Sequence, residues 1–270
     1  MKRKYLYNLA IFLIVTTTAT PALAITSSYF INDHWGDKIW HDADKTRSNT
    51  EDDLMCWAAA ASNILDFGGW TPNTTLNTHD AIFTYYQNHW TDAGGLQEYG
   101  WEWWFNGINA MQGVSGWSQV DVAGGNFYSS LDFSKYYHED WNQSTALSSI
   151  DTYLHNGYGT TLAVYTPSGG GHALSVWGIE YDTSGYLGLW LTDSDDNLDS
   201  DSPPDTLDYY AINYLGNKWV FDNKSSYKGW YIGGVMALAG APVPVPGTLV
   251  LLGTGLGTLL VARRKRSLPC

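Results

Sequence analysis

Cys56 is the residue of this chain whose type and setting are best suited to covalent chemistry. The 270-residue sequence contains one other cysteine, Cys270, which is the last residue. Cys270 lies behind a basic tail, which would stay on the opposite side of a membrane or be discarded, so Cys56 is expected to have no disulfide partner within the mature chain. A buried, inert thiol is the simpler interpretation. A nucleophilic thiol is the functional one.

The residues around Cys56 predict the start of a helix. Asp52 or Asp53 can serve as N-cap, and the following run is apolar and rich in alanine as far as Phe67. A helix over 53–67 would place Cys56 in its first turn. Amide donors and the positive end of the helix dipole lower a thiol pKa there and can hold an oxyanion. This context favours the nucleophile.

A thiol nucleophile needs a base, and His172 is the best candidate. It follows three glycines and opens a buried-strand pattern over 173–181. The glycines leave room for a substrate backbone beside the imidazole. The other histidines have no such pattern and are expected to be structural or exposed: His34, His41, His79, His89, His138 and His155.

Asp193 is expected to orient His172. A second strand pattern ends at Asp193 after a Gly-containing turn, so the two strands should form a hairpin that brings both residues together. We expect the carboxylate to hold Nδ1 while Nε2 meets the thiol. Asp195 and Asp196 follow immediately and could share this task. The alternatives for the acidic run are a solvated loop or a calcium site, with four oxygen donors available: Asp195, Asp196, Asp199 and Asp201.

Both ends of the chain read as targeting segments. Residues 1–24 have a basic start, a short apolar run and a small-residue cleavage site, as in a secretory signal peptide, although a membrane anchor is an alternative. Residues 242–270 contain a Pro-x-Pro element, an apolar stretch long enough to cross a membrane, and a basic tail. A plain membrane anchor would have this order of parts, and either way the middle of the chain faces outward.

Composition makes the middle of the chain strongly acidic. Seven of the 14 Lys and Arg residues lie in the terminal segments, which contain no Asp or Glu, so 7 basic and 27 acidic residues remain and the formal charge is −20. Nucleic acid is therefore not an expected partner. An aromatic segment contains four tryptophans that could form a substrate platform or a carbohydrate-binding surface, although we favour a core role: Trp101, Trp103, Trp104 and Trp117.

Three motifs together resemble the IdeS/Mac group of secreted, immunoglobulin-degrading, papain-like cysteine peptidases. They are DDLMCWAAAASNIL, GGHALSVWGIEYD and LWLTDSDD, in that order. The resemblance implies that Cys56 is the nucleophile, His172 the base and Asp193 the orienting acid, with Asp195 in support. It also implies that Lys45 helps to bind the oxyanion. Trp57 departs from the small residue expected after the cysteine. The C-terminal segment resembles a PEP-CTERM sorting signal, which implies processing by an exosortase, although Val245 replaces the usual Glu.

The expected fold class is α+β, with a papain-like arrangement in which the helix carrying the cysteine packs against an antiparallel sheet carrying the histidine. The expected organisation is a signal peptide over 1–24, one peptidase domain over 25–241 and a sorting signal over 242–270. Periodicity predicts helices over 53–67, 78–90, 101–111 and 144–155, and strands over 160–165, 173–181, 187–193 and 228–238.

The expected function is that of an exported thiol protease that hydrolyses extracellular proteins through a Cys-His-Asp triad, without a cofactor or a metal. It would reside at the cell surface or be secreted, held by the C-terminal helix before any processing. Two alternatives stay open: an acyl or peptidyl transferase or amidase that uses the same thiol, and an inactive surface or biofilm-matrix protein. The sequence does not identify the substrate or the oligomeric state.

Overall fold

The computed structural model describes residues 26–31, 40–46, 51–195, 207–222 and 226–242. The predicted signal peptide lies outside the described residues, and so does the predicted sorting signal except for Pro242. Within the described part of the chain, no helix combines the length and the apolar character needed to span a membrane.

In the described part of the chain, most helices precede most strands in the sequence. The helices are α1 (Cys56–Phe67), α2 (His79–Gln87), α3 (Gln97–Asn106) and α4 (Ala146–His155), with a short 3-10 helix at Phe133–Lys135. The strands are β1 (Ser27–Phe30), β2 (Tyr137–Asp140), β3 (Gly159–Tyr165), β4 (Gly171–Asp182), β5 (Gly185–Thr192), β6 (Asp208–Leu215), β7 (Lys218–Phe221) and β8 (Tyr231–Leu238).

Six antiparallel strands close into a barrel. The order runs β4-β3-β8-β7-β6-β5, and β5 then pairs with β4 to complete the ring, while β1 and β2 extend it through β4 and β8. Closure requires a bent sheet, and β4 supplies bends where its register with β5 shifts between Val176 and Gly178 and between Glu180 and Tyr181. The long strand β4 can therefore pair with β3 near one end and β5 near the other.

This closed barrel corrects the predicted fold class. The papain-like α+β arrangement is wrong, because the strands form a closed six-stranded barrel and the described helices are four short ones. The prediction missed β6 and β7, the strands that join β5 to β8 and complete the ring. Their hairpin was signalled by Gly216 and Asn217, which both take positive φ (56° and 69°), as a type I′ turn requires.

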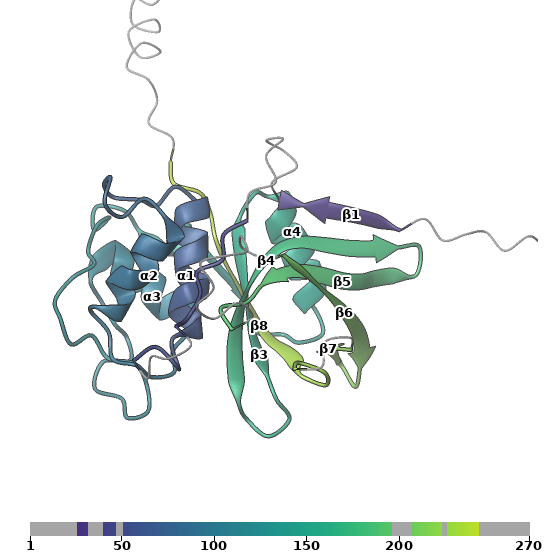
Figure 1. Ribbon diagram of the computed structural model, residues 1–270. Helices are drawn as coiled ribbons and strands as arrows, with labels where there is room; N and C mark the ends of the chain where they lie inside the picture. The colour runs from purple at the N-terminus through teal and green to yellow at the C-terminus, as the bar shows by residue number, and fades with distance from the viewer. Residues whose placement is uncertain (1–25, 32–39, 47–50, 196–206, 223–225, 243–270) are drawn as a thin grey trace, which may run out of the picture.

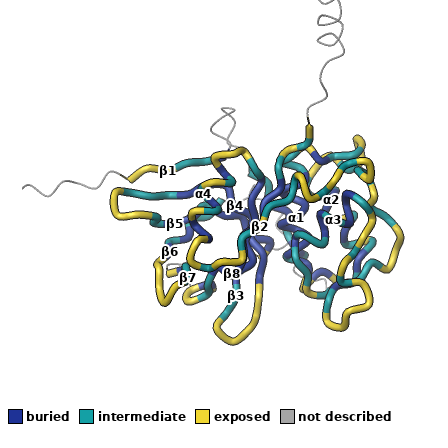
Figure 2. The backbone as a smooth tube through the Cα atoms, turned by 180° about the vertical axis from the view of Figure 1, so that it is seen from behind, coloured by how far each residue is buried: buried dark blue, intermediate teal, exposed yellow. Residues whose placement is uncertain are grey.

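Helices α1, α2 and α3 gather on one side of the barrel (Figure 1). Helix α1 lies between the other two helices and strands β3 and β4, so every residue from Trp57 to Leu65 is buried. Figure 2 shows this continuous buried region where α1 meets the barrel. The small alanines allow that close approach, and α1 is therefore fixed from both sides.

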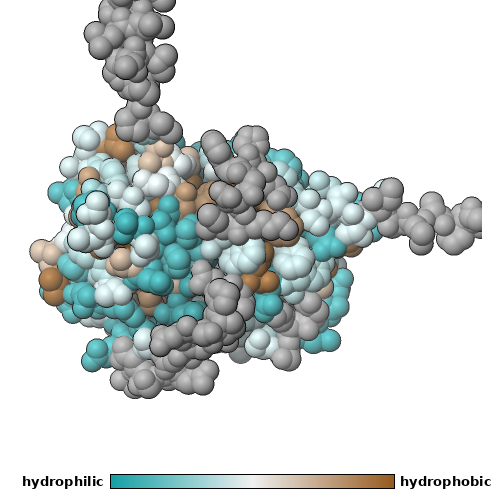
Figure 3. All heavy atoms as spheres, turned by 45° about the horizontal axis from the view of Figure 1, so that its top comes forward, coloured by the Kyte–Doolittle hydropathy of each residue, from teal (hydrophilic) through white to brown (hydrophobic). Residues whose placement is uncertain are grey.

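The predicted elements match the structure in part. Three helices and four strands lie where periodicity placed them, with starts shifted by up to three residues. The helix predicted over 101–111 begins earlier and ends earlier, at Gln97–Asn106, because Gly107 takes a left-handed C-terminal position with φ 76°. The surface is mixed: Figure 3 shows mostly hydrophilic described residues on one face, with apolar atoms in separate small groups.

Candidate active site

The N-terminal strap, residues 40–46, fixes the start of α1 against the barrel. Asn63 of α1 accepts a hydrogen bond from the Ala43 amide (2.8 Å) and donates one to the Ser175 hydroxyl of β4 (3.1 Å). The Asp52 carboxylate accepts hydrogen bonds from the Thr46 amide and from the Gln87 side chain, both at 2.9 Å. Strap, helix and barrel are thus joined by buried polar contacts.

Cys56 is the first residue of α1, so its amide lies among those that lack an intrahelical acceptor. The predicted capping was wrong in detail. Met55 occupies the N-cap position with no side-chain hydrogen bond, because the Asp52 carboxylate is used by Thr46 and Gln87 instead. The helix therefore begins at Cys56. The amide groups of its first turn lie at the same end of the helix as the thiol.

Trp57 does not crowd the cleft. Its indole is 1% exposed and packs under the loop on the helical side, where Nε1 donates to the Ala93 carbonyl at 3.1 Å. A Cβ added at Gly95 would lie 2.7 Å from the Trp57 ring, so the backbone of Gly95 rests directly on the indole. The bulky residue after the cysteine thus supports one cleft wall.

His172 and Asp193 form a short, buried contact. His172 is 8% exposed on β4, Asp193 is 3% exposed just after β5, and Nε2 lies 2.7 Å from Oδ1. The hairpin that we predicted between these segments is present as the β4–β5 pair. The predicted nitrogen was wrong: Nε2 meets the carboxylate, which leaves Nδ1 for the thiol.

Electrostatics favour a charged thiolate and imidazolium. Burial alone would raise the pKa of the Cys56 thiol, but a hydrogen bond with His172 and the positive charges of His172 and Lys45 lower that pKa below its usual value. Burial opposes the charged form of His172 as well, yet the hydrogen bonds and charges of Asp193 and Cys56 raise the His172 pKa. These opposite shifts favour a thiolate–imidazolium pair over two neutral groups.

Lys45 and Asp195 form a second charged pair at the same place. The Lys45 ammonium is almost buried, and it donates to Asp195 Oδ1 at 2.7 Å and to the Asp53 carbonyl at 2.8 Å. Burial would lower the Lys45 pKa, but the Asp195 contact raises it. Asp195 Oδ2 lies 3.9 Å from His172 Nδ1, so Asp193 holds the histidine and Asp195 holds the lysine.

Tyr227 is a site residue that the sequence reasoning missed. Its ring stacks on His172, with ring centroids 5.5 Å apart and an angle of 19° between planes. Burial would raise the Asp193 pKa, but the contact with His172 and, to a smaller extent, a hydrogen bond from the Tyr227 hydroxyl hold that pKa below its usual value. Tyr227 lies in a loop between β7 and β8 with no local motif, so no sequence signal pointed to it.

A cleft of about 660 Å³ contains all five predicted site residues: Lys45, Cys56, His172, Asp193 and Asp195. One wall is the helical side, with Gly94, Gly95 and Trp117, and the other is the barrel side, with Tyr165 and Trp230. A cleft of this size, lined by aromatic rings and glycine backbone, can hold several residues of an extended polypeptide.

The structure also bears on the interpretations of the tryptophan segment and of the possible calcium donors. Trp101, Trp103 and Trp104 are buried in the core, whereas Trp117 lines the cleft. Of the four possible calcium donors, Asp195 binds Lys45, and Asp196, Asp199 and Asp201 lie outside the described residues.

Comparisons with known proteins add no family. No protein-family model matches the chain, and no curated protein sequence matches it either.

Proposed function

We propose that this chain is an exported cysteine endopeptidase whose nucleophile is Cys56. The observation that carries the proposal is the buried His172–Asp193 contact next to the partly buried Cys56 thiol at the start of α1, whose pKa is lowered by a hydrogen bond with His172. A thiol with a lowered pKa, a histidine with a raised pKa and an orienting carboxylate are the parts required for acyl transfer. Their position in a cleft gives a substrate access.

The reaction would proceed in two steps. The Cys56 thiolate attacks the carbonyl carbon, the carbon–nitrogen bond breaks, and the His172 imidazolium gives its Nδ1 proton to the leaving amine. Water then attacks the thioester, His172 takes the proton of that water, and the carbon–sulfur bond breaks to restore the thiolate. Asp193 keeps the imidazole oriented through both steps.

Two donors support oxyanion stabilisation in this proposal. The Cys56 amide lies at the helix start, and the Lys45 ammonium carries three protons, two of which are used by Asp53 and Asp195. The role of Lys45 follows the resemblance to the IdeS/Mac group, which itself rests on the three sequence motifs. The immunoglobulin substrate of that group is not part of the proposal.

Export, membrane attachment and exosortase processing are proposed from the terminal segments alone. The signal peptide would deliver the domain across the membrane, and the C-terminal segment would hold it there until processing. The partner in this setting is an extracellular protein substrate.

The test is thiol labelling of the full-length chain in a Cys270→Ser background, so that Cys56 is the one cysteine left. Iodoacetamide and an E-64-type epoxide should label Cys56 rapidly near neutral pH, and His172→Ala should slow labelling strongly. A wild-type labelling rate equal to that of a free thiol, or a rate unchanged by His172→Ala, would reject the catalytic pair and favour an inactive surface protein.

Substrate and reaction type need a second assay. Incubation with a proteome-derived peptide library, followed by mass spectrometry, should reveal new peptide ends in the wild type and none in Cys56→Ala. Addition of a primary amine separates the alternatives, because a transferase or amidase would yield amine adducts or deamidated side chains rather than cleaved backbones.

A further inference from the structure

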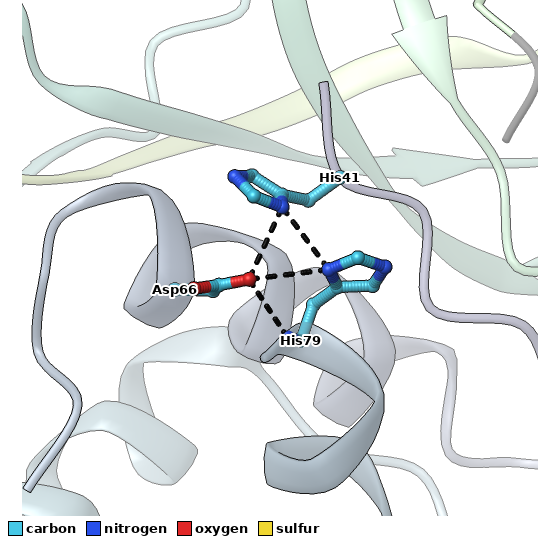
Figure 4. A group of neighbouring side chains, drawn as sticks. All are labelled: His41, Asp66 and His79. Carbon is cyan, nitrogen blue, oxygen red and sulfur yellow. Dashed lines mark hydrogen bonds and ion pairs between the residues drawn. The ribbon is translucent and has the colours of Figure 1, made fainter. Parts of the chain in front are cut away.

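A second cluster of polar side chains lies outside the cleft, where the strap meets α1 and α2. His41 comes from the strap, Asp66 from the last turn of α1, and His79 is the first residue of α2. Figure 4 shows the three side chains converging on one point. None of the three lines the cleft that contains Cys56.

The three converging atoms form a nearly equilateral triangle. His41 Nδ1 lies 3.0 Å from His79 Nδ1 and 3.1 Å from Asp66 Oδ2, and His79 Nδ1 lies 3.2 Å from that same oxygen. The side chains of His41, Asp66 and His79 are only 15–16% exposed, so bulk water does not separate them.

While the Asp66 carboxylate is ionised, protons on the two imidazoles do not satisfy this triangle. If both Nδ1 atoms carry a proton, two N–H groups face each other at 3.0 Å. If one of them lacks a proton, its lone pair faces a carboxylate oxygen at 3.1 or 3.2 Å. The same oxygen already accepts the His79 backbone amide at 2.9 Å. With the Asp66 carboxylate ionised, every protonation state of the two imidazoles therefore leaves at least one unfavourable contact.

A metal ion at the centre satisfies all three lone pairs at once. Bonds of 2.0–2.1 Å in tetrahedral geometry separate neighbouring ligand atoms by about 3.3 Å, close to the observed spacing. Imidazole ligands select first-row transition metals over calcium or magnesium. Coordination through Nδ1 leaves Nε2 to carry the ring proton, and the Asp80 carboxylate lies 3.7 Å from His79 Nε2.

We propose that His41, Asp66 and His79 bind a divalent transition metal of the zinc class. The site joins the strap, the last turn of α1 and the first residue of α2. The His41 carbonyl accepts a hydrogen bond from the hydroxyl of Thr192, the residue before Asp193, at 2.9 Å. Lys45 lies on the same strap, four residues after His41. Metal binding therefore clamps the strap that carries Lys45 onto the helices and the barrel. The role of the metal is structural, and the metal takes no part in the reaction at Cys56.

The test is direct metal binding to the full-length chain. Purified protein stripped with a chelator should take up one equivalent of Zn²⁺ by mass spectrometry of metals and by calorimetry. Zn²⁺ at a hundredfold excess over its dissociation constant should raise the melting temperature by about 5–10 °C. Magnesium and calcium at the same concentration should not. No uptake by the wild type would overturn the proposal without touching the proposed peptidase.

Variants separate this site from the other His-carboxylate groups. His41→Gln and Asp66→Asn should each abolish the Zn²⁺-dependent shift. The matched control is His155→Gln, because His155 Nδ1 lies 3.0 Å from Asp151 in a partly exposed pair that has no third metal-ligating side chain among the described residues. His172→Ala is the second control, since His172, Asp193 and Asp195 also lie close together. Retained binding in Asp66→Asn, or loss of binding in His172→Ala alone, would refute the assignment.

A spectroscopic measurement tests the site without substituting His41, Asp66 or His79, in case those variants fail to fold. Co²⁺ added to a Cys56→Ser, Cys270→Ser chain should give visible d–d absorption without thiolate charge transfer. Zn²⁺ should displace the signal at one equivalent. Absence of a saturable signal in this folded protein would contradict the proposed site.

Discussion

His172 Nε2 lies 2.7 Å from Asp193 Oδ1, and both side chains are nearly inaccessible to solvent. The contact joins the start of β4 to the residue after β5, two segments that are 21 positions apart but adjacent in the barrel. Because one ring nitrogen is held by the carboxylate, the other is directed to the thiol side. Orientation of the imidazole is thus a property of strand pairing rather than of a flexible loop.

Asp193→Asn should reduce kcat/KM for peptide cleavage by about 10²-fold or more, because the amide no longer stabilises the imidazolium or selects its tautomer. Asp195→Asn should cost less than about tenfold, since Asp195 pairs with Lys45 rather than with His172. Both variants carry the same chemical change, from carboxylate to amide. Steady-state kinetics of the two variants therefore check that Asp193, and not Asp195, orients His172. Equal losses would contradict it.

Labelling of Cys56 should depend on pH in a direction set by the two pKa shifts. The thiol pKa is lowered, so the thiolate should persist to pH values below those of a free cysteine and be lost as pH falls through the lowered pKa. The His172 pKa is raised, so peptide cleavage should decline as pH rises through that value and the imidazolium is lost. Cleavage should therefore follow a bell-shaped curve, and His172→Ala should move the labelling curve to higher pH. A labelling curve that matches free cysteine would contradict this.

Tyr227→Phe should remove one hydrogen bond to Asp193 and preserve the ring that stacks on His172. We expect kcat to fall by about 3–10-fold, because one hydrogen bond to the orienting acid is lost. The acidic limb of the rate profile should move to higher pH, since Asp193 loses a donor that lowers its pKa. A purely structural role for Tyr227 would leave the pH profile in place, and Tyr165→Phe on the same cleft provides a control.

Gly95→Ala should destabilise the chain by about 1–3 kcal/mol, because its new methyl group would lie 2.7 Å from the Trp57 ring and force the loop away. Gly94→Ala is the matched control: an added Cβ there meets nothing within 4 Å, and the residue is exposed. Chemical denaturation of both variants measures the difference. Equal free energies of unfolding would show that the loop does not rest on the indole.

How much of the site could be read from the sequence depends on how local its signals are. Cys56 stands at a helix start that is marked by composition. His172 and Asp193 stand at the ends of two strands joined by a short turn, so periodicity and turn chemistry were enough to place these two residues together. Tyr227 comes from a distant loop without a motif, and His41 and His79 looked like ordinary histidines. Long-range contacts of this kind leave no periodic trace in the chain.

The amino-acid sequence by itself determined the position of the candidate nucleophile Cys56, its helix and the hairpin that brings His172 to Asp193, because those features depend on neighbouring residues. The tertiary structure decided three things. It closed the sheet into a barrel through β6 and β7, it assigned Nε2 rather than Nδ1 to Asp193, and it brought His41, Asp66 and His79 to one point. Each of these depends on how distant segments pack, and packing geometry is set by the whole chain.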